Sequence, residues 1–564
     1  MTRMTWIAEV TRATFRKAYL YGRRFAVVIG VTLAVVLAST VTIDLGPALR
    51  ERAEREGGIW FERKVTIGRL GVHLARGRFV VEDLQIDGML PGEPPWLVAK
   101  RIEASITWSA LFGREVLIDT VEMTDWQMVV ESFPDGRQTF PRVTGPPRPP
   151  RTGPSPVVTT LQYVHAYRGE LIVDDFGSDW RAVAPNLDIT VSRVGEYRGQ
   201  LRYNDGIIAI QDYVPMWADM AASFTIADNE IVFDRISLTT DGGDTTATGV
   251  VELDNLPEQF YHVKSRLQLP RMREIFFARD TYDLHGVADF TGTFHKFDGG
   301  REVKGDFTSA LPGVNEYRFP NMAGSMVWVA ERMDVTHARA DFAGGTSAFR
   351  FSMAPLDIPA TPGRAQFDVD YTDVDLRVLS DFFEMDGLTV AGRMSGRNEM
   401  AWPIGSSALS TGSGTAAISP PAGVALQGPE LTAAAADAAR FRATVLGPFS
   451  NHTPRAPVAV GGQVTYAFDP EVLRFEPSCL STEDTYVAFE GATAYGERSK
   501  MPFRVTSRNW QESDRLVAGI MTAFDAPTKA VPLDGIGQFE GVLLGAFRRP
   551  RIEGSILGLE MRAW

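Results

Sequence analysis

An uncharged stretch, Phe25–Ile43, constrains the fold more than any other part of the sequence. Its polar side chains are the hydroxyls of Thr32, Ser39, Thr40 and Thr42, which a helix can satisfy with its own carbonyl groups. A helix rises about 1.5 Å per residue, so the stretch extends roughly 30 Å, the hydrocarbon thickness of a bilayer. The sequence therefore predicts a transmembrane helix over residues 25–43.

The charges that flank this stretch predict its orientation. Residues 1–24 carry six basic side chains against one acid, Glu9, and Asp44 follows the stretch directly. Because positive charge is retained in the cytoplasm, we expect residues 1–24 to be a cytoplasmic basic segment and the body after Ile43 to lie across the membrane. A cleaved signal peptide is the alternative, although the apolar run is long for one and no A-x-A cleavage site follows.

Composition excludes several classes of function for the body. With 44% hydrophobic and 23% charged residues, the chain is too apolar to be disordered. Its net charge of -13 and the lack of a Lys/Arg run argue against nucleic-acid binding. A single cysteine, Cys479, excludes an intrachain disulfide and so a small disulfide-stabilised scaffold.

Alternating side chains predict that most of the body is β-sheet. Ile102, Ala104, Ile106 and Trp108 alternate with polar residues in the segment RIEASITW. A period of two marks a strand with one apolar face and one solvated face. The same alternation recurs to the end of the chain, so the prediction is a mainly β protein.

One short helix is expected between the apolar stretch and the strands. The segment PALRERAERE, over Pro47–Glu56, is polar and has proline at its start. Gly57-Gly58 follow it, and glycine is typical of a helix end. Strands are therefore expected from Trp60 onward.

Composition also divides the body into segments. A Pro-rich break covers residues 141–156, where proline cannot donate to a sheet ladder. A region rich in Gly, Ala, Ser and Pro, 403–462, is expected to be a loop with at most one short helix. The predicted order is a cytoplasmic segment (1–24), a transmembrane helix (25–43), an N-terminal β region (44–140), the Pro-rich break (141–156), β-sheet repeats (157–402), the loose region (403–462) and a further repeat that stops inside a strand (463–564).

Three stretches of the body resemble one another and predict stacked repeats. They begin near Ile231, Met333 and Val472, and each has alternating strands, one short helical turn, and strands punctuated by glycine. Chance resemblance among β-rich segments is the alternative. The landmarks that match in order between the first and last copies are Gly249 with Gly491, Phe290 with Phe539, Gly292 with Gly541, and Gly305 with Gly554.

The body resembles the AsmA-like family of bacterial envelope proteins. Its N-terminal region is similar in the stretches IGRLGVHLARGRFVVEDLQIDG (67–88), PPWLVAKRIEASITWSALF (94–112) and VEMTDWQMVVESFPDGRQTFP (121–141). The repeats resemble the TamB branch, with F-x-G and P-R-I-E-G between Phe539 and Gly554. The resemblance implies an N-terminal transmembrane helix in the bacterial inner membrane, followed in the periplasm by an elongated, curved, repeat-built β-sheet groove (β-taco-like).

The same resemblance implies a function in the cell envelope. Because the family is similar to chorein-type bridge-like lipid-transfer proteins, we expect phospholipids to pass along an apolar groove towards the outer membrane. Some members assist outer-membrane protein assembly, so the second hypothesis is a scaffold whose sheet edge pairs with a client strand. The C-terminal module of the full-length TamB pattern does not follow Trp564. Expected partners are phospholipids, the inner membrane, and an outer-membrane protein or a C-terminal continuation of the same protein.

The groove hypothesis depends on strands with one apolar face. Phe349 and Phe351 lie on one face, with Arg350 on the other. The same pattern is also expected in the closed core of a sandwich or barrel. The groove is favoured because the chain has little helix to cover its sheet and its anchor makes lipid available. The candidate groove residues are Ile102, Ile106, Trp108, Phe349, Phe351, Phe367, Val369, Tyr371, Phe503 and Val505.

No pattern in the sequence predicts catalysis, and we expect a non-enzymatic protein without a cofactor or metal. The seven histidines are scattered and lack H-E-x-x-H or C-x-x-C partners. Asp368, Asp370, Asp373 and Asp375 lack the glycine spacing of a calcium loop, and alternating acids are typical of a solvated strand face. Neither a nucleophile elbow nor a phosphate loop is present.

Overall fold

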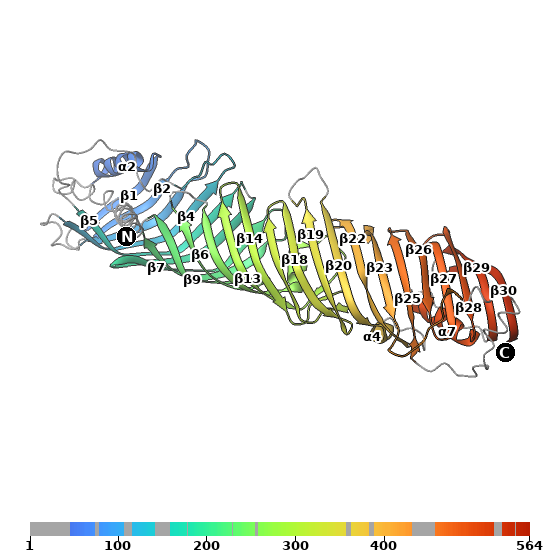
Figure 1. Ribbon diagram of the computed structural model, residues 1–564. Helices are drawn as coiled ribbons and strands as arrows, with labels where there is room; N and C mark the ends of the chain where they lie inside the picture. Colours follow the sequence, from blue (N-terminus) through green and yellow to red (C-terminus); the bar gives the residue numbers. More distant parts are fainter. Residues whose placement is uncertain are drawn as a thin grey trace, which may run out of the picture. The chain divides into compact units, whose positions relative to one another are not determined.

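The computed structural model describes residues 46–73, 78–106, 115–140, 158–177, 179–227, 229–253, 258–356, 363–382, 389–430, 457–523, 533–546 and 549–563. The predicted transmembrane helix (25–43), the segment before it (1–24) and the Pro-rich break (141–156) lie outside these residues. Within the described part, no helix combines the length and apolarity needed to cross a membrane. The described residues are mainly β-strand, which confirms the predicted fold class at that level (Figure 1).

Twenty-five of the described strands belong to one sheet by their hydrogen bonding. Contacts divide the chain into two compact units. Unit 1 comprises the residues up to Ala278 with Val287–Phe307 and Val327–Ala330, and unit 2 comprises Arg279–Gly286, Thr308–Met326 and Glu331–Trp564.

Unit 1 is built on consecutive paired strands. β4 and β5 pair in parallel, on either side of the Pro-rich segment, and the neighbouring pairs from β5 to β13 are antiparallel. The elements are α2 (Pro47–Phe61), β1 (Val65–His73), β2 (Arg78–Ile86), β3 (Leu97–Ile106), β4 (Glu115–Ser132), β5 (Val158–Asp175), β6 (Trp180–Val194), β7 (Glu196–Ile210), β8 (Met216–Ala227), β9 (Glu230–Thr240), β10 (Gly243–Glu252), β11 (Gln259–Gln268), α3 (Leu269–Phe276), β13 (Val287–Phe297), β14 (Gly300–Ser309) and the end of β17 (Met322–Val329).

The alternation predicted around Ile102 is confirmed in β3. Ala104 is only 1% exposed and Ile102 packs against the same buried cluster, whereas Arg101 on the other face is exposed. That cluster extends from α2 across β1 to β8. The apolar face of unit 1 is therefore well buried near its first strands.

Helix α2 is longer than predicted. Gly57 and Gly58 lie inside it, and it ends where Glu62 adopts a left-handed backbone with φ of 55°. Gly57 is buried, and a Cβ there would lie 3.4 Å from the side chain of Val65. The helix therefore continues through both glycines and packs on Val65, and the first strand starts at Val65 rather than near residue 60.

Helix α2 also protects the first strand. The carboxylate of Glu54 accepts the N–H of Ile67 at 2.8 Å, and Arg50 donates to the carbonyl of Gly68 at 3.2 Å. These are backbone groups that another strand would otherwise pair with. Side chains of α2 therefore satisfy part of the outer edge of β1.

Unit 2 continues with antiparallel pairs. The main ladder runs β18–β19–β20–β22–β23–β25–β26–β27–β28–β29–β30. The elements are β12 (Leu284–His285), β15 (Gly313–Val314), β16 (Tyr317–Arg318), the start of β17, β18 (Arg332–Phe342), β19 (Gly345–Ala354), β20 (Arg364–Asp375), α4 (Leu376–Phe382), β21 (Val390–Ala391), β22 (Arg393–Pro403), η3 (Ser407–Leu409), β23 (Thr411–Ser419), β24 (Val458–Ala459), β25 (Gly461–Phe468), β26 (Val472–Ser481), β27 (Thr485–Ala494), β28 (Ser499–Ser507), α7 (Trp510–Ala523), β29 (Leu533–Ala546) and β30 (Arg549–Ala563).

One part of the region predicted to be loose, 403–462, is instead a regular strand. Residues 411–419 (TGSGTAAIS) form β23, which pairs with β22 and β25. Glycine weakens an isolated strand, but rings from β25 cover the glycines here. A Cβ at Gly412 would lie 2.7 Å from the Phe468 ring, and one at Gly414 would lie 2.6 Å from the Tyr466 ring.

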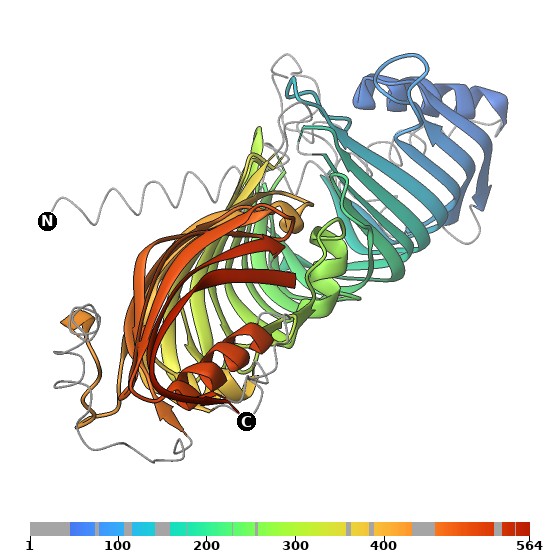
Figure 2. The same ribbon diagram turned by 90° about the vertical axis from the view of Figure 1, so that its right-hand side faces the viewer.

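A short helix occurs in each of the three resembling stretches, as predicted. Helix α3 follows β11, α4 follows β20 and α7 follows β28. The sequence around α4 explains its start, because the carboxylate of Asp375 accepts the N–H of Arg377 at 2.9 Å. Figure 2 shows α7 on the concave side of the curved strands of unit 2.

A buried glutamate at the start of α7 predicts a pH dependence. Burial of Glu512, with Asp484 nearby, raises its pKa, against hydrogen bonds from Thr482 and Thr485 that lower it. The folded state therefore binds a proton more readily than the unfolded state. Stability of the α7 region should rise as the pH falls from neutral through the raised pKa towards the ordinary value of 4.5, and then level off.

Glu512→Gln isolates this effect from other carboxylates. The amide keeps an oxygen that can accept the two hydroxyl bonds but has no charge to desolvate. We expect the variant to be more stable than the wild type at pH 7 and equal to it at pH 4, measured by hydrogen exchange of α7. A variant less stable at pH 7 would contradict the prediction.

Candidate functional site

The apolar face of unit 2 brings the predicted groove residues together. By strand register, Phe351 of β19 lies beside Phe367 of β20, and Phe349 lies beside Val369. Tyr371 follows on the same face of β20. All five side chains are half-buried. None belongs to either buried cluster of the described residues, so this row is packed mainly by its neighbours on the sheet.

Aromatic pairs recur along this face. The Phe349 and Phe367 rings are 5.5 Å apart between centroids, and Phe503 and Phe539 repeat that spacing on β28 and β29. Such pairs add to the stability of the sheet beyond their burial. Further pairs on the same face are Phe351 with Trp402 at 6.1 Å and Phe475 with Phe489 at 5.2 Å.

Glycines let these rings lie flat on the sheet. A Cβ at Gly541 would lie 2.3 Å from the Phe539 ring, and one at Gly554 of the next strand would lie 2.6 Å from it. A ring that covers two glycines fills the space that their side chains would occupy. The face therefore stays shallow while remaining apolar.

The matching landmarks of the first copy have the same arrangement in unit 1. The Phe290 ring lies against Gly292 of its own strand and against Gly305 of β14, and a Cβ at these glycines would lie 2.7 and 2.8 Å from the ring. In the sequence, Phe290 matches Phe539, Gly292 matches Gly541, and Gly305 matches Gly554. The two copies therefore share a local packing motif.

Two tyrosines place neutral, hydrogen-bonded hydroxyl groups at this face. Tyr371 donates to the carbonyl of Thr415 at 3.0 Å, and Tyr466 donates to Asn398 at 3.3 Å. Burial raises the pKa of Tyr371 to about 12, with a smaller contribution from Tyr466. Both phenols therefore remain neutral at physiological pH.

The opposite face of the same strands is hydrophilic. Arg350 contacts Asp368 at 3.6 Å across β19 and β20, directly behind the aromatic row. The alternating acids of β20 lie on this face, as predicted for a solvated surface. The sheet of unit 2 is therefore amphipathic.

Val505 lies on the same face but is more deeply buried than the aromatic row. It is 4% exposed, while Phe503, two residues earlier on the same face, is half-buried. Helix α7 accounts for the difference, because Ser513 of α7 hydrogen-bonds to Ser507 at the end of β28. Helix α7 therefore covers this margin of the sheet and buries Val505, whose role as a groove residue stays a prediction.

The margin next to α7 has its own small core. It contains Leu516 of α7, Leu376 of α4 and the parallel pair β21–β24. Leu379, Met394, Ile418 and Leu480 pack against it. Short helices thus cover one edge of the apolar face but leave the aromatic row outside their cluster.

The predicted groove residues of unit 1 differ in their placement. Ile102 packs against the buried cluster near α2, so it is part of a core. Ile106 ends β3, but its side chain lies outside the described residues, as does Trp108 entirely. Unit 1 also has an aromatic ladder that was not among the predicted residues. It comprises Phe224, Phe233, Tyr261 and Phe294, with ring centroids 5.9, 6.2 and 6.1 Å apart.

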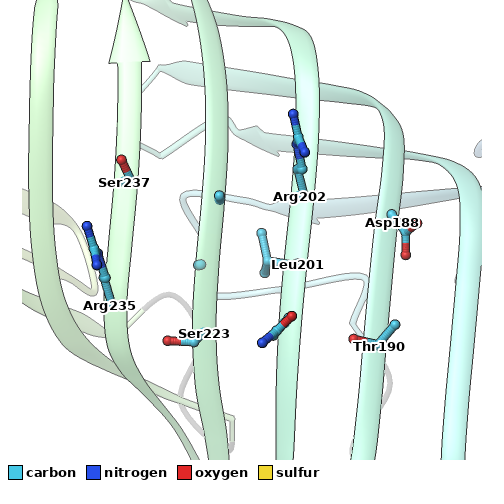
Figure 3. Close-up of a pocket in the computed structure, with 10 residues that line it drawn as sticks. Asp188, Thr190, Leu201, Arg202, Ser223, Arg235 and Ser237 are labelled. Carbon is cyan, nitrogen blue, oxygen red and sulfur yellow. The ribbon is translucent and has the colours of Figure 1, made fainter.

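A depression of about 580 Å³ lies on the polar face of unit 1 (Figure 3). Its labelled side chains include Arg202, Ser223 and Arg235, from the neighbouring strands β7, β8 and β9. Asp188 also lines it and is hydrogen-bonded to His165 at 3.0 Å. This charged lining does not suit an acyl chain.

A second depression, of about 1060 Å³, lies behind β27 to β30 in unit 2. Arg504 and Glu540 of the polar face line it, together with Phe489 and Phe503. Neither depression includes the aromatic row of β19 and β20. The apolar face of unit 2 is the better candidate site for a hydrophobic ligand.

Comparison with known proteins gives no family: no protein-family model and no curated protein sequence matches this chain. The resemblance to the AsmA-like family consequently rests on the sequence stretches quoted above and stays a prediction.

Proposed function

We propose that the chain is an inner-membrane-anchored periplasmic lipid-transfer protein, which conducts phospholipids along an apolar β-groove towards the outer membrane. One observation carries the proposal: the aromatic row of β19 and β20 is apolar, half-buried and separate from both buried clusters. Soluble proteins avoid large uncovered apolar surfaces unless these bind something. Acyl chains match such a face in polarity.

The polar back of the sheet supports the same proposal. Ion pairs such as Arg350–Asp368 keep that side in water while the aromatic side is shielded by its ligand. The flat rings leave room for a chain lying along the sheet. No chemistry on the lipid is needed, so the proposed protein is a conduit and not an enzyme.

Phe349→Asp is expected to abolish lipid retention. A carboxylate in the aromatic row would have to be desolvated against an acyl chain, so bound phospholipid should fall by about tenfold or more. The measurement is lipid extraction and mass spectrometry of the purified full-length chain. The fold should persist, because Phe349 is half-buried.

Ala348→Asp is the matched control. Ala348 precedes Phe349 on β19, faces the polar side and pairs in register with Arg339. The same new charge there should leave lipid retention unchanged. If both variants retain lipid, or if Phe349→Asp unfolds, the aromatic row is a closed core and the proposal fails.

The alternative is a scaffold for assembly of outer-membrane β-barrel proteins. Strand β30, which pairs with β29, favours it by exposing Ile552 and Ile556 at 48% and 49%. A client strand could pair with such an edge. Co-purification of an unfolded β-protein instead of lipid, lost in Ile552→Asp, would support this alternative.

A further inference from the structure

A buried ion pair in unit 1 joins two distant strands. Asp175 ends β5, Lys296 lies near the end of β13, and their charged groups are in contact. The two side chains are 4% and 3% exposed. Asp175 also accepts the N–H of Gly177 at 3.0 Å. Burial of this kind requires that protein surround the pair on every side.

The ends of the strands form two opposite margins of the sheet. Asp175 lies at one margin and Lys296 at the other. Asp175 pairs with Trp180, so the end of β5 lies beside the start of β6. The antiparallel order continues to Gln268, at the end of β11, which pairs with Val287 at the start of β13. The start of β13 therefore lies at the same margin as Asp175. Lys296 lies near the end of β13, and so at the opposite margin.

Seven strand pairings separate β5 from β13: β5–β6, β6–β7, β7–β8, β8–β9, β9–β10, β10–β11 and β11–β13. At ~4.8 Å per strand, a flat sheet would hold these residues more than about 30 Å apart. Contact is possible only if the sheet curls until its margins meet.

The direction of the curl follows from the strand faces. Lys296 is two residues after Phe294, which packs in the aromatic ladder with Tyr261. Asp175 is four residues after Leu171 in β5 and so lies on the same face, and Leu171 packs against the buried cluster. Both charged side chains therefore project from the apolar face, so the ion pair spans the inside of the curl.

An aromatic cluster makes a second contact of the same kind. Phe276, the last residue of α3, is 5.0 Å from Tyr213 and 5.1 Å from Trp328 between ring centroids. Tyr213 follows β7 and Phe276 follows β11, whose ends share the margin of Asp175. Trp328 is the next-to-last residue of β17, which ends at Val329.

Trp328 lies at the margin of Lys296. Strand β14 starts at Gly300, directly after the turn that follows Lys296, and ends at Ser309. Strand β17 begins beside the far end of β14, because the N–H of Asn321 donates to the carbonyl of Ala310 at 2.9 Å. The end of β17 therefore returns to the Lys296 margin, and the cluster joins the same two margins.

These contacts together form a seam, which we define as the Asp175–Lys296 pair with Tyr213, Phe276 and Trp328. We propose that this seam is a lateral gate on the apolar face of unit 1. While the seam is closed, a bound acyl chain can move only along the curl. Sideways exchange with a membrane or vesicle requires the margins to part. This inference rests on the proposed function in naming an acyl chain as the ligand.

The test cross-links the seam in the full-length chain. Tyr213→Cys/Trp328→Cys in a Cys479→Ser background is treated with a short reducible bis-thiosulfonate, since the two rings are 6.3 Å apart. We expect efficient cross-linking and about tenfold slower transfer of preloaded phospholipid from unit 1 to acceptor vesicles. Reduction should restore the rate. Lipid in unit 1 is monitored with a spin label near Phe294.

A matched cross-link separates gating from general stiffening. Thr239→Cys/Asp244→Cys joins β9 and β10 on the polar face, where the native side chains hydrogen-bond at 2.9 Å. This link should leave transfer unchanged. Failure of the seam pair to cross-link would show that the margins do not meet, and unchanged transfer after cross-linking would show that they do not gate. If no variant binds lipid, the proposed function fails, while the cross-linking yield still decides whether the seam exists.

Variants of the ion pair give an independent test. Asp175→Asn removes the carboxylate opposite Lys296 and should speed lipid transfer and hydrogen exchange at the ends of β5 and β13 by about tenfold. Asp175→Leu/Lys296→Met replaces both charges by apolar groups of similar size, which buried pairs commonly tolerate. That double variant should exchange lipid at nearly the native rate. Faster transfer in the double variant than in Asp175→Asn would overturn the proposal.

Discussion

Val505→Asp is expected to unfold the part of unit 2 around β28, with a loss of at least about 3 kcal/mol in local stability. Val505 is 4% exposed and lies in register between Val487 of β27 and Phe539 of β29. Helix α7 covers the end of the same strand. An aspartate there would leave a desolvated carboxylate facing apolar neighbours. Hydrogen exchange of β28 amides measures the loss.

Phe503→Asp is the matched variant, because it places the same charge two residues away on the same face. Phe503 is half-buried, and a carboxylate there can remain partly solvated. Its loss of stability should be less than half that of Val505→Asp, and it should release bound lipid. Equal losses of stability in the two variants would mean that Phe503 is as fully covered as Val505, as expected in a closed core.

Gly305→Ala is expected to destabilise unit 1 by about 2–3 kcal/mol, a large effect for one methyl group. The added Cβ would lie 2.3 Å from the carbonyl oxygen of Thr291 and 2.5 Å from the Cα of Gly292. Both atoms are backbone, so a side-chain rotation cannot relieve the clash. β13 and β14 would have to separate, and the Phe290 ring would lose its place. Thermal unfolding and hydrogen exchange of β13 measure the effect.

Gly71→Ala is the control for Gly305→Ala. Gly71 also lies in a strand, β1, but the nearest atom to a Cβ there is the Val80 carbonyl oxygen at 3.8 Å, an ordinary contact. The substitution should be neutral or stabilise the protein by about 0.5 kcal/mol, because alanine restricts the unfolded chain. Similar losses in the two variants would show that glycine is required for flexibility and not for close approach.

Strand identity was predictable because its signal is local. The alternation around Phe349 and Arg350 is a property of successive residues, and a strand places successive side chains on opposite faces. The three short helices were predictable for the same reason. Phe290 and Phe539 match in the repeat sequence. In the structure, each of these rings covers glycines on two adjacent strands.

Other features were set by long-range contacts that no short window records. Gly57 lies within α2 because Val65 packs against it, and β23 is a strand because rings of β25 cover its glycines. Val505 and Phe503 have the same pattern in sequence, yet α7 buries one margin of the sheet and leaves the other half-exposed.

The sequence by itself determined that this protein is mainly β, that its strands are amphipathic and which side chains share a face, because these follow from neighbouring residues. Only the tertiary structure decided which parts of the apolar face are covered, and that Asp175 meets Lys296. Those outcomes depend on how far the sheet curls. The curl sums small twists over many strands, and no single stretch of sequence contains that sum.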